Sequence, residues 1–248
     1  MQRMLNKVPT LFLLTALSAS AMASFLPRLH HPDNWTGFDI GVQLGQGWSK
    51  NDFTYVGPNF FNTTGTGLIL GNSFNINTNG AVGGGFLGYT YQADENWTFG
   101  IEGAISATDL KTEQPSPFFA ATDVYSTKIN WYSTVKGKIG FIANHWHGYV
   151  AGGWGGADVR LTLNDPFDQV EASNKHWTNG WVWGAGVNYR ILPCIIMGAA
   201  YEHLRLDHKQ ETFGCAGCGN TSTTTTPIVD GRATIQTATL RLSYLFDL

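Results

Sequence analysis

The stretch Trp97-Thr98-Phe99-Gly100-Ile101-Glu102-Gly103-Ala104-Ile105-Ser106 decides the fold class. Its odd-numbered positions carry large apolar residues and one glycine, whereas its even-numbered positions carry small or polar residues. A period of two places alternate residues on opposite faces of a β-strand. The stretch therefore predicts a strand with one apolar face and one face of small or polar side chains.

Similar alternation recurs along the chain and gives about eight predicted strands. The other segments lie near residues 37–50, 80–91, 129–141, 148–163, 177–190, 195–207 and 232–246. In 129–141 the predicted apolar face includes Ile129, Trp131 and Val135. Glycines and mixed residues leave the faces ambiguous in 148–163 and 195–207. A merged pair of strands in 148–163, or a further strand where Leu68, Leu70 and Phe74 alternate, stays open.

The connections between these segments alternate in length. Short links lie around residues 94–96, 144–146 and 192–194, and long polar links cover 51–79, 108–127, 164–176 and 208–231. Bacterial outer-membrane barrels have short periplasmic turns, long external loops and an even number of strands. The sequence therefore predicts an all-β, eight-stranded antiparallel up-and-down transmembrane barrel with both termini in the periplasm. A soluble sandwich is disfavoured, because the polar faces would form a poor core.

The composition excludes several classes of protein. Only 13% of the 248 residues are charged, 43% are hydrophobic and 13% are aromatic, whereas soluble proteins average about 25% charged residues. Many aromatic residues and a low net charge exclude a disordered chain. No apolar run outside the N-terminus approaches the roughly 18 to 20 residues of a membrane helix. No basic tract suggests a nucleic-acid partner.

The first residues predict export from the cytoplasm. Arg3 and Lys7 precede an apolar core at residues 11–17 and a small-x-small cleavage site at 21–23, as in secretory signal peptides. We expect a signal peptide at 1–23, a periplasmic segment at 24–34 and the barrel domain at 35–248. Removing the signal peptide takes two of the 15 basic residues and none of the 18 acidic ones, so the net charge becomes −5.

The predicted faces define two sets of residues. An eight-stranded barrel is just wide enough for its own side chains, and unpaired buried charges are costly, so charged residues on inward faces should form a network. Its predicted members are Glu102, Lys136, Lys138, Arg190, Glu202 and Arg241. The network forms either a structural plug or a narrow, switchable ion path. The predicted lipid-facing and girdle residues are Trp97, Phe99, Trp131, Trp181, Trp183, Tyr189, Tyr244 and Phe246.

Other motifs point to no cofactor and no metal. Cys215 and Cys218 have the spacing of a redox or zinc half-motif, but neither a βαβ context nor two further ligands accompany them. They predict a small loop disulfide, which leaves Cys194 as a free thiol near a turn. A G-x-G-x-x-G pattern at residues 83–88 continues as a strand rather than a helix, which argues against a dinucleotide site.

Several segments together resemble a known family. They are residues 35–41 (WTGFDIG), 83–89 (GGGFLGY), 96–102 (NWTFGIE), 135–140 (VKGKIG), 149–153 (YVAGG) and 184–189 (GAGVNY). They are similar to the opacity-type small outer-membrane β-barrel proteins, the eight-stranded bacterial surface antigens with a porin-like barrel domain. The family usually ends on an aromatic residue, whereas this chain places Asp247 and Leu248 after Phe246. The family pattern also does not require Cys215 and Cys218.

The resemblance implies a non-enzymatic structural protein or surface antigen of the bacterial outer membrane. Its external loops would mediate adhesion or contact with a host or envelope ligand, and its other partners would be outer-membrane lipid and the barrel-assembly machinery. The alternative is a narrow, low-conductance channel for ions or small solutes. A lipid-modifying enzyme is less favoured, because Ser106 and Ser243 have no histidine at an obvious neighbouring height.

Overall fold

The computed structural model describes residues 34–57, 71–116, 123–165, 170–212, 214–216 and 228–246. The predicted signal peptide, residues 24–33 of the predicted periplasmic segment, and Leu68 and Leu70 lie outside the described residues. The long strands are β1 (Gly37–Gly57), β2 (Ser73–Gln92), β3 (Trp97–Pro115), β4 (Val124–Ala143), β5 (Trp146–Asp165), β6 (Val170–Leu192), β7 (Ile195–Leu206) and β10 (Ile228–Phe246). Two short strands, β8 (Lys209–Thr212) and β9 (Gly214–Ala216), follow β7. Among the described residues, no helix is long and apolar enough to cross a membrane.

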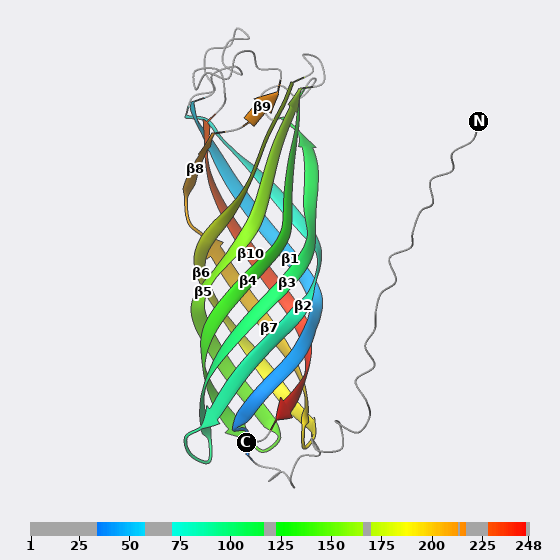
Figure 1. Cartoon of the computed structure of the whole chain (residues 1–248), viewed down its shortest axis with the longest axis vertical. Helices are drawn as coiled ribbons and strands as arrows, with labels where there is room; N and C mark the ends of the chain where they lie inside the picture. The colour runs from blue at the N-terminus through cyan, green and yellow to red at the C-terminus, as the bar shows by residue number, and fades with distance from the viewer. Residues whose placement is uncertain are drawn as a thin grey trace, which may run out of the picture.

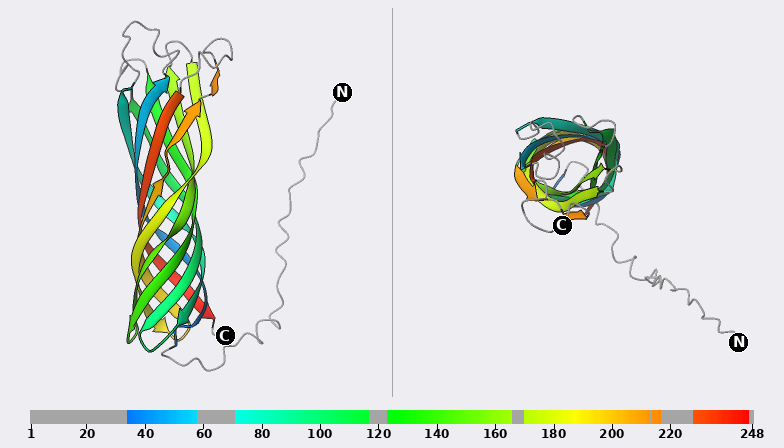
Figure 2. Two further views of the ribbon diagram at one scale, coloured as in Figure 1. Left: turned by 90° about the vertical axis from the view of Figure 1, so that its left-hand side faces the viewer. Right: turned by 90° about the horizontal axis from the view of Figure 1, so that it is seen from above.

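The eight long strands form a closed antiparallel ring (Figure 1). Each long strand pairs with the next along the chain, β7 pairs with β10, and β10 pairs with β1 to close the ring. The view from above in Figure 2 shows this closure. The two short strands do not add a ninth and a tenth strand to the ring. Each pairs with the side of one long strand, β8 with β10 and β9 with β6. The predicted eight-stranded barrel is confirmed.

The strands are longer than the sequence pattern predicted. β1 continues to Gly57, β2 begins at Ser73 and β6 begins at Val170, so parts of the predicted long loops are strand. A tilted strand of about 9–11 residues crosses a bilayer, whereas β1 and β2 have 21 and 20 residues. The barrel therefore extends well beyond the thickness of one membrane.

The chemistry of the two faces reverses along the barrel. In the half that carries the short turns and Phe246, the outward face is apolar, as in Phe38, Ile40, Val42 and Leu44 of β1, and these residues are exposed. We call this outer band, which on β1 runs from Phe38 to Trp48 and is apolar at every outward position except Gln46, the membrane belt. Beyond it, the outward positions of β1 are polar or charged until Val56.

The polarity of the inward side chains also changes along the barrel, in the opposite direction to that of the outer face. Level with the membrane belt, the inward side chains are mainly polar or charged. From the outer part of the belt onward, two apolar clusters line the lumen, the outer one of which contains Phe53, Tyr55, Phe74, Ile76, Tyr125, Leu161, Leu163, Ala172 and Val229. The outer half of the barrel is therefore built like a soluble protein, with an apolar core and a polar surface.

Two β-bulges lie near the level of this reversal. In the β4–β5 ladder, Asn130 and Trp131 together oppose a single residue of β5, and a matching irregularity lies between Ala107 and Leu110 of β3. An extra residue shifts the alternation by one position. Ile129 is consequently 0% exposed and Trp131 is 39% exposed. The prediction that Ile129 shares the outward face of Trp131 is wrong for this reason.

Tight turns join the strands at the end that carries Phe246. In the β2–β3 turn, Asp94 Oδ1 accepts hydrogen bonds from the backbone N–H groups of Asn96 (2.9 Å) and Trp97 (2.8 Å). These two bonds hold the pKa of the Asp94 carboxyl below its usual value. In the β4–β5 turn, Asn144 adopts a left-handed conformation with φ of 55°. Cys194 lies in the β6–β7 turn as a free thiol.

Candidate functional site

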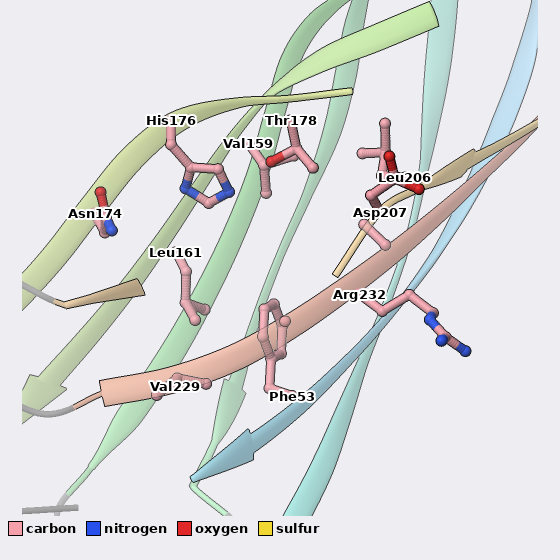
Figure 3. A pocket seen from close by; sticks show the side chains of 12 residues that line it. Phe53, Val159, Leu161, Asn174, His176, Thr178, Leu206, Asp207, Val229 and Arg232 are labelled. Carbon is pink, nitrogen blue, oxygen red and sulfur yellow. The ribbon is translucent and has the colours of Figure 1, made fainter. Parts of the chain in front are cut away.

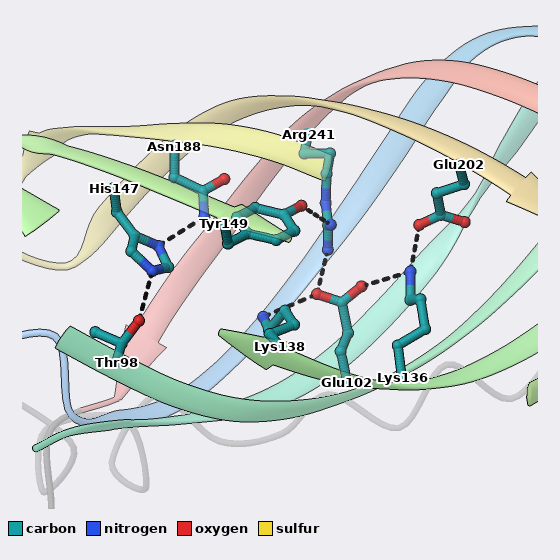
Figure 4. Close-up of polar contacts among 9 residues, drawn as sticks. All are labelled: Thr98, Glu102, Lys136, Lys138, His147, Tyr149, Asn188, Glu202 and Arg241. Carbon is teal, nitrogen blue, oxygen red and sulfur yellow. Dashed lines mark hydrogen bonds and ion pairs between the residues drawn. The ribbon is translucent and has the colours of Figure 1, made fainter. Parts of the chain in front are cut away.

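Five charged side chains from four strands meet inside the barrel, level with the membrane belt (Figure 4). We call them the lumen charge cluster: Glu102 of β3, Lys136 and Lys138 of β4, Glu202 of β7 and Arg241 of β10. The ladders explain the meeting, because Glu102 pairs directly with Lys136 across β3 and β4, and Lys138 lies two residues further along the same face. Glu202 and Arg241 face them from the other side of the ring.

Glu102 is the centre of this cluster. Its Oε1 lies 3.1 Å from Lys136 Nζ, and its Oε2 lies 3.0 Å from Lys138 Nζ and 2.7 Å from Arg241 Nη2. Lys136 also forms an ion pair with Glu202. The Glu102 carboxylate therefore forms ion pairs with three cationic side chains, and Glu202 shares one of these, Lys136.

Aromatic rings complete the packing around Arg241. Its Nη1 donates to the Tyr149 hydroxyl at 2.7 Å, and its guanidinium carbon lies 3.7 Å from the centroid of the Phe86 ring. Gly186 on the neighbouring strand makes room for Tyr149, because a Cβ there would lie 2.5 Å from the phenol oxygen. The contacts position Arg241 between an anion, a hydroxyl and a ring face.

The cluster is closed to solvent. Its five members are between 1% and 7% exposed. Asp39 is also buried at this height, since it pairs with Gly88, which in turn pairs with Glu102. Three basic and three acidic side chains thus share one section of the lumen. Buried charges of both signs therefore occupy the lumen at this height.

Arg190 lies apart from the cluster, so the prediction that it belongs to the same network is wrong. It is buried at the end with the tight turns, where its Nη2 donates to the Asn34 carbonyl at 2.7 Å and its guanidinium carbon lies 4.3 Å from the Trp35 ring centroid. We call Trp35, Ile142, Ile196 and Leu245, which cluster here, the periplasmic cap. His147 packs 5.0 Å from the Trp35 ring and hydrogen-bonds to Thr98 at 2.8 Å.

A small cavity lies in the outer half, near a gap in the strand pairing along β6 (Figure 3). β6 pairs with β7 as far as Gly180 and Leu206, and next with β9 at Ser173, so that no described strand pairs with β6 between them on this side. The cavity is lined by residues that include Phe53, Leu161 and Thr178, and its volume is about 30 Å³. That volume suits about one water molecule.

The predicted lipid-facing residues lie on the outside of the wall. Trp97, Phe99 and Phe246 lie toward the turn end, and Trp131, Trp181 and Trp183 lie near the other edge of the membrane belt, all exposed. Tyr189 is 36% exposed and Tyr244 is of intermediate exposure. Aromatic girdles at two levels match the two interfaces of a bilayer.

The remaining sequence candidates contribute no described site. Cys215 lies in β9, but its side chain and the whole of Cys218 lie outside the described residues, so the loop disulfide stays a prediction. The part of the chain that the structure describes contains no group of three metal-ligating side chains. Trp35, Tyr149 and His147 contact the buried charged residues or the cap but were not predicted as site residues from the sequence. Tyr149 was hidden because glycines obscure the alternation of β5.

The closed ring, the membrane belt and the two girdles define an outer-membrane β-barrel protein. The chain belongs to the family described as outer membrane protein beta-barrel domain, whose model matches residues 10–246. Its location is the bacterial outer membrane.

Curated relatives agree with this assignment. The 31 kDa outer-membrane immunogenic protein of Brucella melitensis is 24% identical over 194 residues, which cover 75% of this chain and 79% of the relative. The 25 kDa outer-membrane immunogenic protein of Brucella ovis is 22% identical over 179 residues, which cover 72% of this chain and 73% of the relative. Among solved structures, OprG from Pseudomonas aeruginosa matches with a TM-score of 0.47 and 10% identity over 86% of this chain and 98% of its own. Ail of Yersinia pestis matches with a TM-score of 0.35 and 15% identity over 83% of this chain and 99% of the Ail chain.

Proposed function

We propose that this protein is a non-conducting, non-enzymatic surface protein that holds its external segments above the outer membrane for contact with a partner. The observation that carries the proposal is the lumen charge cluster. Glu102 and its three cationic partners occupy the lumen at the level of the membrane belt. A barrel filled in this way serves as a rigid support and not as a pore.

Two further seals support a closed lumen. The periplasmic cap blocks one end with Trp35 and Arg190. The apolar clusters fill the other end, where the Tyr55 and Tyr125 hydroxyls hydrogen-bond at 2.7 Å across the lumen. A solute would have to displace all three layers.

The outer half of the barrel supports a role in presentation. Its strands continue beyond the membrane belt with a polar surface and an apolar core, so their outer ends lie away from the bilayer. Exposed segments on a rigid scaffold are the usual location of binding residues. The curated relatives are named immunogenic, which fits exposure at the cell surface.

A narrow channel is the second candidate, and liposome swelling separates it from a sealed barrel. Proteoliposomes made with the full chain should swell in an isotonic pentose solution no faster than protein-free vesicles, because the lumen charge cluster blocks the path. Vesicles with a general porin provide the positive control. Swelling that increases with the amount of this protein would contradict the sealed barrel.

The structure offers no support for an enzyme at the serines considered from the sequence. Ser106 is 0% exposed, and its Oγ accepts a hydrogen bond from Gln43 Nε2 at 2.9 Å. Ser243 is also buried. A catalytic serine needs a general base and access to substrate. We expect the mass spectrum of lipid A to be the same in cells with and without the protein, and a new acylation state would contradict a non-enzymatic role.

A further inference from the structure

Four basic side chains stand side by side on the outer face of β3, β4, β5 and β6. Lys111 pairs with Lys128, Lys128 pairs with Arg160, and Arg160 pairs with Lys175. All four are exposed. We call this set the basic row. Adjacent strands are about 4.8 Å apart, so the row spans roughly 14 Å.

The position of the basic row relates it to the membrane surface. Lys175 lies two residues beyond Trp177 on the same strand, and Trp177 packs 4.6 Å from the ring of Trp131. Two residues of a strand span about 7 Å. Tryptophan girdles lie at the boundary between hydrocarbon and headgroups. Lys175, at one end of the basic row, is therefore level with the headgroups of the outer leaflet.

The charges of the row are only partly balanced within the protein. Lys111 Nζ lies 3.6 Å from Asp109 and Lys175 Nζ lies 3.4 Å from Asp158. Lys128 and Arg160, in the middle, form no ion pair with any described residue. Glu113, on the same face of β3, lies in the next row, opposite Ser126. Like charges directly across a ladder are unfavourable, so the row is arranged to receive an external anion.

The distribution of the other basic residues agrees with this orientation. The described lysines and arginines that point outward all lie beyond the membrane belt: Lys50, Lys111, Lys128, Arg160, Lys175, Arg205 and Arg232. The other basic side chains of known placement, Lys136, Lys138, Arg190 and Arg241, are buried inside the barrel. The rim at the tight turns has no outward basic residue among those described. Among the described residues, outward-facing positive charge therefore lies on the external side of the membrane belt.

We propose that the basic row binds the phosphate groups of outer-leaflet lipid. Arg160 presents a guanidinium fork that matches two phosphate oxygens, and Lys128 supplies a neighbouring point charge. The length of the row suits two phosphates, on one glycolipid or on adjacent ones. Trp131 and Trp177 lie below, where the sugar or upper acyl portion of the same lipid would rest. The lipid anchors the outer half of the barrel at a fixed height in the membrane.

Native mass spectrometry of the full chain in detergent micelles tests this assignment. The probes are bisphosphorylated lipid A and the same lipid after removal of its phosphates. The test variant is Lys128→Gln with Arg160→Gln. The matched control is Lys50→Gln with Arg205→Gln, which removes two outward charges beyond the belt that are separated by Thr234 rather than adjacent. Heat-modifiable gel migration establishes that both variants are folded.

The wild-type protein and the control should retain the phosphorylated lipid, and the test variant should bind it about tenfold more weakly or worse. Raising the salt concentration should weaken binding to the wild-type protein. Equal losses in the two variants would overturn the proposal, because they would indicate a general charge effect. Equal retention of the dephosphorylated lipid, or full displacement by millimolar inorganic phosphate or by heparin, would also overturn it, since the site would then not be specific for lipid phosphate.

Discussion

Replacing Glu102 with alanine should lower the free energy of unfolding of the barrel by about 3–5 kcal/mol, as expected when one partner of a buried ion cluster is removed. Lys136, Lys138 and Arg241 would remain in the lumen without their shared carboxylate. Urea unfolding in detergent micelles, followed by tryptophan fluorescence, measures the change. Because Glu102 is 1% exposed, water cannot replace the lost contacts without opening the wall.

Two companion variants make this result specific. Glu113→Ala, on the outward face of the same strand, should change stability by no more than about 0.5 kcal/mol. Glu102→Gln keeps the volume and removes the charge, so its loss should approach that of the alanine variant. A loss below about 1 kcal/mol for Glu102→Ala would mean that the cluster does not stabilise the barrel as described.

Arginine in the middle of the membrane belt should be nearly as damaging. Val42 is 57% exposed on the outer face of β1, and Val42→Arg would place a charge in hydrocarbon at a cost of about 2–4 kcal/mol. Val56→Arg is the matched control, because Val56 is 42% exposed on the same strand beyond the belt. Urea unfolding in phospholipid vesicles should show a loss for Val42→Arg and a change within about 0.5 kcal/mol for Val56→Arg. Equal losses would place both valines in the membrane.

The alternation of residues predicted the ring of eight strands but not the length of its strands. In 51–57, Phe53 and Tyr55 point inward and Asp52 and Thr54 point outward. The alternation of inward and outward side chains continues from the preceding residues. The outward face is now polar and the inward face apolar, because the surroundings change from hydrocarbon to water. Read with the lipid-facing pattern, this segment resembled a polar loop. The segment can be recognised as a strand because polar and apolar residues still alternate, with the polar residues now on the outward face.

The bulge in β4 explains why the face of Ile129 was mispredicted. A strict period of two carries the face of Trp131 back to Ile129, whereas the extra residue places Ile129 inside the barrel. Nothing in a single sequence marks this bulge, because it depends on the ladder with β5.

The charged members of the site were predicted, but their contacts were not. The inward alternation identifies Glu102 and Lys136, and closure of the ring brings Glu202 and Arg241 to them from β7 and β10. Height along the barrel depends on the register of every ladder between these strands, which the sequence does not reveal. Arg190 also points inward, but the register of its ladders places it at a different height, at the periplasmic cap.

The central claim is that only the membrane belt lies in hydrocarbon while the outer half of the barrel stands in water. Spin-label accessibility on β1 measures this most directly. Single cysteines at Val42, Leu44, Asp52 and Thr54, in a chain whose native cysteines are replaced by serine, would carry a nitroxide on the outer face. We expect Val42 and Leu44 to be accessible to oxygen and shielded from a water-soluble nickel complex, and Asp52 and Thr54 to show the reverse. Oxygen accessibility that continues unchanged to Thr54 would contradict the account.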